Sequence, residues 1–394
     1  MMTLIRSRIT SQKTPLDNVG HLMCAKSHFN RWRSGFALRG GFALIVLSVF
    51  LSGCAESILV KAECREAGNL SVICGFENPE DLVNIPGTDV VIVSEFKLGE
   101  GTGQLSLLDT ATSSITRLFP GNTPQPLLAK ALRWGDPSCE KLPEQRFNPH
   151  GIGLSTRADG LLQLLVVNHA ERESVEFFEV QKTGALVALT WKGCAVAPEG
   201  RTLNDVVALP QGGFLVTHTG TDLVSPKGML NALRGLGGVN IGHVLEWSAE
   251  AGFSKVPGTE VAYANGIQVS PRGGIIYLNE YFGNRVKKIN RHTGELLNEI
   301  KVLRPDNLSW DQAGNLLVAS QSASILKMAF CQPKKGYSCI TGFDIISIDP
   351  LTFDQQTIVS HDGLPFGAAT VAIRLKNKIY MGTYVGDRIA VATL

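Results

Sequence analysis

Side chains that carry oxygen atoms recur at one position of a repeated sequence pattern. Each copy of the pattern has a polar or small cluster, an alternating apolar strand, a Gly or Asp turn and a second strand. At the start of five copies stand Glu80, His150, Asn204, Asn265, and Asp306 with Asn307. Carboxylate and amide oxygens are the ligands that a hard cation such as Ca²⁺ prefers. The set therefore predicts a calcium site, provided that the fold gathers these positions.

A β-propeller is the architecture that would gather them. The pattern occurs six times, beginning near Glu80, Pro149, Leu203, Ala264, Pro305 and Ala369. These starts are roughly 40 to 70 residues apart, which is the period of a four-stranded blade. The innermost strand of each blade starts at one end of the central channel, so equivalent positions of all blades meet on one axis. We therefore expect an all-β fold, a six-bladed β-propeller over residues 75–394 with a central calcium site.

Several motifs resemble those of the paraoxonase/arylesterase family, within the broader gluconolactonase and strictosidine synthase-like superfamily. The resemblance covers most of residues 75–394 and is strongest over 147–178, 203–209 and 264–280. It rests on Phe147-Asn-Pro-His-Gly-Ile, Leu165-Val-Val-Asn-His169, Leu203-Asn-Asp-Val-Val-Ala, Ala264-Asn-Gly-Ile-Gln-Val and Asp306-Asn-Leu-Ser. It implies a six-bladed propeller that holds two calcium ions and hydrolyses lactones and esters.

The resemblance also implies roles for individual residues. A catalytic calcium would be held by Glu80, Asn204, Asn265, Asp306 and Asn307. A buried structural calcium would be held by Asp81, Asp205 and the carbonyl of Ile152. His150 and His169 would form a catalytic dyad.

Lactone hydrolysis needs an activated water and a stabilised oxyanion. Calcium with an open coordination position can polarise the carbonyl, and a histidine of near-neutral pKa can take the proton of the water. His150 is the candidate base, and His169 would orient it or relay the proton. We expect a calcium-dependent hydrolase of lactones, aryl esters or both, with a small-molecule substrate. No residue specifies the natural substrate or the oligomeric state.

Two other functional hypotheses assume the same fold. A gluconolactonase-like sugar lactonase is also a six-bladed metal propeller, and a non-catalytic surface-anchored propeller could bind a ligand in the same channel. The His150 and His169 pair favours the paraoxonase reading. A serine hydrolase is disfavoured because the chain lacks a Gly-x-Ser-x-Gly motif.

The first 53 residues read as a lipoprotein signal peptide. Basic residues precede an apolar run from Phe42 to Leu51, too short for a stable bilayer span. The run ends in Leu51-Ser52-Gly53-Cys54, which resembles a bacterial lipobox and implies cleavage before Cys54 and lipidation of its sulfur. Ala55 follows, with no Asp for inner-membrane retention, so we expect a lipid-anchored envelope protein of the outer membrane. Residues 54–74 would form a tether, and Met23 is an alternative start.

The charge distribution and the cysteine content indicate which classes of partner and which cellular compartment suit the protein. Residues 1–53 carry seven basic residues and one acid, and the remainder carries 30 basic and 34 acidic residues. A slightly acidic body argues against nucleic acid as a partner. Beyond Cys54, the six cysteines Cys64, Cys74, Cys139, Cys194, Cys331 and Cys339 suit disulfides in an exported protein. Their pairing is open, with Cys331 to Cys339 preferred because they flank a short loop.

Two further features of the sequence bear on how the ring closes and on what interrupts the third blade. In vertebrate members of the family, an N-terminal cysteine pairs with one near the C-terminus. This chain ends without one, so ring closure would rest on strand pairing or another bridge. A helical segment between Ser225 and Gly238 interrupts the third blade, as either a lid beside the channel or a surface insertion.

Overall fold

The structure is a computed structural model and describes residues 59–66, 68–97, 101–121, 132–143, 146–184, 186–222, 225–331 and 336–394. The expected signal peptide over residues 1–53, the alternative start Met23 and the expected lipidation site Cys54 lie outside these ranges. No helix in the described ranges has the length and apolarity needed to cross a membrane.

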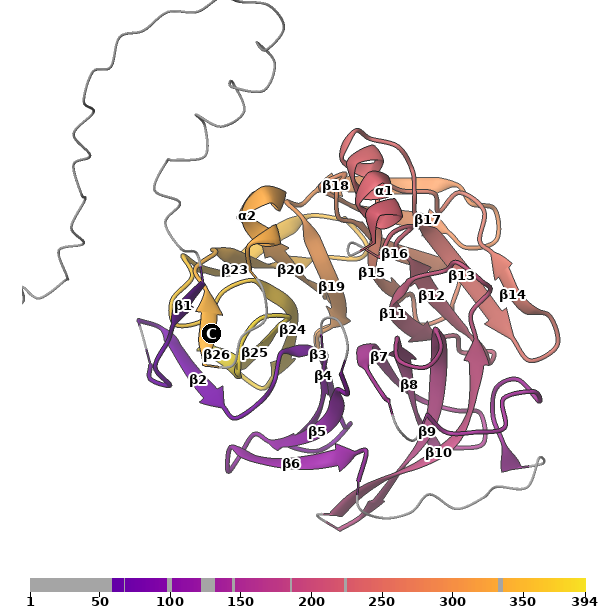
Figure 1. Ribbon diagram of the computed structural model, residues 1–394, viewed down its shortest axis with the longest axis horizontal. Coiled ribbons are helices and arrows are strands. Elements are labelled where there is room, and N and C mark those ends of the chain that lie inside the picture. The colour runs from indigo at the N-terminus through magenta and orange to yellow at the C-terminus, as the bar shows by residue number, and fades with distance from the viewer. Residues whose placement is uncertain are drawn as a thin grey trace, which may run out of the picture. The chain divides into compact units, whose positions relative to one another are not determined.

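Six four-stranded antiparallel sheets surround a central axis (Figure 1). This confirms the predicted all-β, six-bladed propeller. The first three blades comprise β3 (Pro79–Asn84), β4 (Val90–Glu95), β5 (Gln104–Asp109) and β6 (Ser114–Phe119); β7 (Pro149–Thr156), β8 (Leu162–Asn168), β9 (Ser174–Thr183) and β10 (Leu186–Val196); and β11 (Leu203–Ala208), β12 (Phe214–His218), β13 (His243–Ser248) and β14 (Gly252–Lys255).

The other three blades continue around the ring. They comprise β15 (Ala264–Val269), β16 (Ile275–Glu280), β17 (Arg285–Asn290) and β18 (Leu296–Lys301); β19 (Pro305–Trp310), β20 (Leu316–Gln321), β22 (Phe343–Ile348) and β23 (Gln355–His361); and β24 (Ala369–Leu375), β25 (Lys378–Thr383), β26 (Arg388–Thr393) and β2 (Leu70–Cys74). The inner strands β3, β7, β11, β15, β19 and β24 begin at or within one residue of the six predicted repeat starts.

Apolar side chains fill the spaces between neighbouring blades. The blade 1 and blade 2 cluster includes Ile92 and Leu164, and the blade 2 and blade 3 cluster includes Leu165 and Phe214. Four further clusters occupy the remaining junctions, so each blade packs both faces against neighbours. Two-sided burial explains why the inner halves of the blades read as apolar runs in the sequence.

The ring is closed by a strand from the N-terminal side. β2 pairs antiparallel with β26, from Leu70 opposite Ala392 to Cys74 opposite Arg388. Of the two alternatives left open by the sequence, strand pairing or another bridge, strand pairing closes the ring. Part of the expected tether over residues 54–74 therefore belongs to the propeller, because β2 is a strand of blade 6. β1 (Leu59–Lys61) precedes it and forms a separate two-stranded sheet with β21 (Tyr337–Cys339).

Arg388 holds the segment before β2 in place. Its side chain is 1% exposed and donates to the carbonyls of Ala62 and Glu63 over 3.0 and 2.8 Å. The disulfide between Cys64 and Cys74 joins the same segment to β2. The remaining disulfides are Cys139–Cys194 and Cys331–Cys339, and the latter confirms the preferred pairing.

Two helices lie at the end of the ring where the inner strands begin. α1 (Pro226–Leu236) follows β12, whose last residue His218 is opposite Leu203 at the start of β11. α2 (Ile325–Ala329) follows β20, in which Ser320 is opposite Pro305 at the start of β19. In the view of Figure 1, α1 overlaps blade 4. Both helices therefore lie at the end of the ring at which the predicted site residues lie.

Candidate metal centre and histidine pair

A register irregularity at the start of every inner strand shapes the candidate site. In β11 the pairing with β12 skips from Leu203 to Val206, and in β15 it skips from Ala264 to Ile267. The other four inner strands show the same interruption. Because a bulge frees residues from the ladder and redirects their side chains, the motif residues can turn toward the axis.

The five residues predicted to hold the catalytic calcium are buried at the starts of inner strands, and four of them, Glu80, Asn265, Asp306 and Asn307, interact with one another. Glu80, Asn204, Asn265, Asp306 and Asn307 are each at most 7% exposed. Asn307 donates to Glu80 over 3.0 Å, and Gln321 donates to Asp306 over 2.7 Å.

Two glycines allow the inner strands to approach each other. A side chain at Gly151 would collide with the backbone of Asn204, and one at Gly266 would collide with the backbone of Asp306. Each of these glycines lies one residue after a predicted site residue, His150 or Asn265. Only glycine permits this spacing between neighbouring blades.

Four of the gathered oxygens are buried without a hydrogen-bond partner. They are Glu80 Oε2, Asn204 Oδ1, Asn265 Oδ1 and Asn307 Oδ1, from blades 1, 3, 4 and 5. Buried oxygen atoms without partners are costly, so a group of them is best explained by a cation. In the described ranges no three His, Cys, Asp or Glu side chains form a metal-binding group by themselves. The amide oxygens are therefore essential to this donor set, which suits calcium.

Asp81 and Asp205 form a second acidic pair on the axis. Asp81 accepts from the amides of Leu82 and Ile152, and Asp205 accepts from those of Val206 and Ile267, all over 2.7 to 2.8 Å. Each aspartate thereby links its blade to the next. Ile152 meets Asp81 through its N–H, whereas the family resemblance implied a role for its carbonyl.

The buried acids repel one another. Burial and the nearby carboxylate of Asp205 hold the pKa of Asp81 well above its usual range. Burial also raises the pKa of Asp205 to about 7, and burial with Glu80 raises that of Asp306. A cation among these groups would favour their ionised forms.

His150 and His169 form the predicted pair. His150 Nδ1 lies 2.8 Å from His169 Nε2, and His150 Nε2 lies 3.6 Å from Glu80 Oε1. The ring of Phe96 stacks on His150 with a centroid separation of 4.6 Å. Burial lowers the pKa of His150, but the carboxylates of Glu80, Asp205 and Glu173 outweigh it and raise the pKa overall.

Three residues of this site were missed by the sequence analysis. Glu173 contacts His169 at 3.0 Å, Gln321 links Asp306 to the hydroxyl of Tyr281, and Phe96 covers His150. Glu173 could have been found as an acid four residues after a predicted dyad member. Phe96 and Gln321 come from the ends of second strands, where no repeated motif marks them.

Two other histidines are structural. His218 is 4% exposed, its Nδ1 lies 3.0 Å from the amide nitrogen of Thr202, and its ring is 5.0 Å from that of His243. His243 lies opposite His218 across β12 and β13 and is 9% exposed. Burial and His218 lower the pKa of His243 to about 4.

Helix α1 contacts the segment that follows β16. Its Gly235 packs against Phe282, whose ring lies 4.7 Å from that of Tyr263, two residues before Asn265. Met229, Leu230 and Leu233 of this helix are largely exposed.

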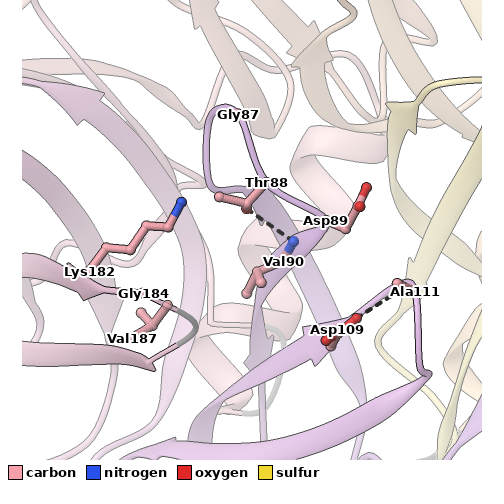
Figure 2. A pocket seen from close by; sticks show the side chains of 9 residues that line it. All are labelled: Gly87, Thr88, Asp89, Val90, Asp109, Ala111, Lys182, Gly184 and Val187. Atoms are coloured by element: carbon pink, nitrogen blue, oxygen red, sulfur yellow. Dashed lines mark hydrogen bonds between the residues drawn. The ribbon is translucent and has the colours of Figure 1, made fainter.

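A separate hollow of about 320 Å³ lies away from this site (Figure 2). It is lined by the β3–β4 turn, by Asp109 and Ala111, and by Lys182, Gly184 and Val187 at the β9–β10 turn. Because β3 runs away from Glu80, its turn into β4 lies at the opposite end of the blade. Thr88 and Asp109 bond to nearby backbone, and Asp89 pairs with Lys376 over 2.6 Å.

Comparison with known proteins identifies relatives of this chain. The arylesterase family model matches residues 73–390. Human serum paraoxonase/arylesterase 1 is 26% identical over 282 residues, which cover 67% of this chain and 76% of the relative. The mouse protein of that name is 27% identical over 246 residues, covering 60% and 66%. A gluconolactonase structure from Xanthomonas campestris aligns with a TM-score of 0.47 at 13% identity, covering 85% of this chain and 97% of that one.

Proposed function

This chain belongs to the arylesterase family, and we propose that it is a calcium-dependent hydrolase of lactones, aryl esters or both. The observation that carries the proposal is the group of four unpaired, buried oxygens from four blades beside the contact of 2.8 Å between His150 and His169. A donor set and a base at one end of a channel are what ester hydrolysis requires.

Glu80, Asn204, Asn265, Asp306 and Asn307 would hold the catalytic calcium. Asp81, Asp205 and the carbonyl of Ile152 would hold a second, structural calcium that stabilises the hub. When bound, the catalytic ion would polarise the substrate carbonyl and stabilise the negative charge that develops on its oxygen.

The protein side chains would supply the proton transfers. His150 Nε2 would take a proton from the attacking water, and the water oxygen would add to the acyl carbon. The acyl–oxygen bond then breaks, and the proton passes to the departing alkoxide to give a hydroxy acid from a lactone. His169 would orient His150 through the contact between His169 Nε2 and His150 Nδ1. Phe96 would restrict rotation of the His150 ring by stacking on it.

A substrate panel with and without EGTA tests this proposal. The panel comprises γ-lactones, δ-lactones, aryl esters and a sugar lactone. We expect turnover of unsubstituted lactones or aryl esters that EGTA abolishes and calcium restores. Full activity in EGTA would overturn the calcium mechanism. Turnover of the sugar lactone alone would support a gluconolactonase-like enzyme, and no turnover of any substrate would support a binding module.

We further propose that the chain is a lipid-anchored protein of the bacterial outer membrane. The support is the lipobox-like Leu51-Ser52-Gly53-Cys54 after a basic, apolar leader. Metabolic labelling with a fatty acid, followed by membrane fractionation, should find labelled protein in the outer membrane. The variant Cys54→Ser should lose both the label and the membrane association. Equal membrane recovery of the variant would contradict the anchor.

A further inference from the structure

Glu173 ends a chain of three polar contacts that begins at the metal centre. Glu80 is 3.6 Å from His150 Nε2, His150 Nδ1 is 2.8 Å from His169 Nε2, and both Glu173 oxygens are 3.0 Å from His169 Nδ1. The Glu173 and His169 side chains are 23% and 16% exposed, so solvent only partly screens their contact.

The carboxylate of Glu173 can only accept, which fixes the direction of its own hydrogen bond with His169 and of the bond between His169 and His150 when both rings are neutral. His169 must donate from Nδ1–H, so the neutral ring presents an unprotonated Nε2 to its neighbour. His150 must then donate from Nδ1–H. Its Nε2 consequently carries a lone pair on the side of the metal centre, where a base has to act.

Glu173 is itself held from a second direction. Its Oε1 accepts from the backbone amide of Leu203, the first residue of β11, next to the site residue Asn204. The adjacent Arg172 does not compete for Glu173, because its guanidinium pairs with Glu176 over 2.8 Å. Glu173 therefore connects the histidine pair to the strand that carries one of the candidate metal ligands.

We propose that Glu173 is a positioning residue that sets the tautomers of His169 and His150. Its effect on turnover rests on the proposed hydrolase function, but its effect on the tautomers does not. Glu173→Gln is the sharpest test because it preserves shape. If its single carbonyl oxygen accepts from Leu203, its amide group donates to His169 Nδ1 and reverses the chain, which places a proton on His150 Nε2.

The experiment uses the full chain with calcium in three variants. Glu173→Gln should lower kcat for a lactone about 10- to 100-fold with little change in KM, as losses of orienting partners do elsewhere. Glu173→Asp, which keeps an acceptor, should recover part of the loss. Glu171→Gln is the matched control, since Glu171 lies in the same loop and its side chain accepts from the amide of Arg146 over 2.9 Å.

Nitrogen-15 NMR of the histidine rings reports which ring nitrogen carries the proton. A purely structural role of Glu173 would leave that protonation site unchanged. We expect His169 protonated at Nδ1 in the wild type and at Nε2 in Glu173→Gln. The same tautomer in both proteins, or unchanged kcat in Glu173→Gln, would overturn the proposal. If the wild type hydrolyses no lactone or ester, the proposed function fails, and the NMR comparison alone still decides the role of Glu173.

Discussion

The side-chain nitrogen of Asn307 donates a hydrogen bond to Glu80 Oε1 over 3.0 Å. This bond joins blade 5 to blade 1, and the two residues are 227 positions apart in the sequence. The bond occupies the Asn307 nitrogen and one Glu80 oxygen. Asn307 Oδ1 and Glu80 Oε2 are left unpaired and buried. A contact between two candidate ligands thus frees the two atoms that a cation needs.

Asn265→Ala should remove one of the four unpaired oxygens together with a bond to Asp306. We expect turnover of a lactone to fall about 10³-fold, because loss of a charge-stabilising group in a dry site costs that much. Calcium affinity, measured by titration calorimetry, should fall in parallel. Asn298→Ala in exposed β18 is the control and should leave both unchanged. Normal calcium affinity in Asn265→Ala would remove this residue from the ligand set.

His150→Gln should lower kcat by about 10²-fold, the usual contribution of a general base. This loss is smaller than that of Asn265→Ala, because the donor set survives. The calcium-induced rise in melting temperature should therefore persist in His150→Gln. Wild-type kcat in this variant would assign the base to another group.

Calcium removal should make stability fall as pH rises. The pKa of Asp205 is about 7 in the folded protein against 3.8 for a free side chain. The folded state therefore binds this proton more tightly, and its stabilisation is present below about pH 4 and lost toward about pH 7. Melting temperatures in EGTA should be lower at the higher pH. In EGTA, the melting temperature of Asp205→Asn should depend less on pH than that of the wild type. An equal dependence on pH in the two proteins would contradict the prediction.

His243 should make the stability of the protein fall as pH falls, which is the opposite of the effect of Asp205. Its pKa of about 4 lies below the ordinary value of 6.5, so the folded state disfavours its protonation. Stability that is present above about pH 6.5 should be lost as pH falls toward about 4, on the order of 2 kcal/mol. Denaturant unfolding of His243→Gln should show a weaker acid loss than the wild type. His292→Gln, at an exposed turn, should behave like the wild type.

Arg388→Leu should destabilise the ring closure by about 2 to 4 kcal/mol, because the buried guanidinium no longer donates to the carbonyls of Ala62 and Glu63. Urea unfolding measures the change. The comparison is Lys255→Ala, which loses an exposed pair with Glu260 and should cost below about 1 kcal/mol. Equal losses in the two variants would mean that the carbonyls of Ala62 and Glu63 find other partners.

The sequence was enough to locate the blades because each inner strand opens with the same arrangement of polar residue, small residue and apolar run. Asn204-Asp205 and Asn265-Gly266 are examples in which the motif itself lies on the axis. The gathering of the five candidate calcium ligands followed from that periodicity. It did not require knowledge of any side-chain contact.

Other features depend on register, which a single sequence does not specify. β2 has no repeat motif, and only its pairing with β26 assigns Leu70–Cys74 to blade 6. The Cys139–Cys194 bridge joins a loop to β10 across 55 residues. Phe96 follows the second strand of blade 1, so its position over His150 emerges only when blades 1 and 2 are packed together.

The junction of β2 with β26 imposes an order on biogenesis. Ser71 bonds to Val391, 320 residues later, so the first strand of the propeller to be synthesised has to wait for its partner. Until that partner arrives, an edge of blade 6 is exposed and the hub is open on one side. A circular permutant that links β26 directly to β2 and begins between two other blades would move this waiting period to a different seam.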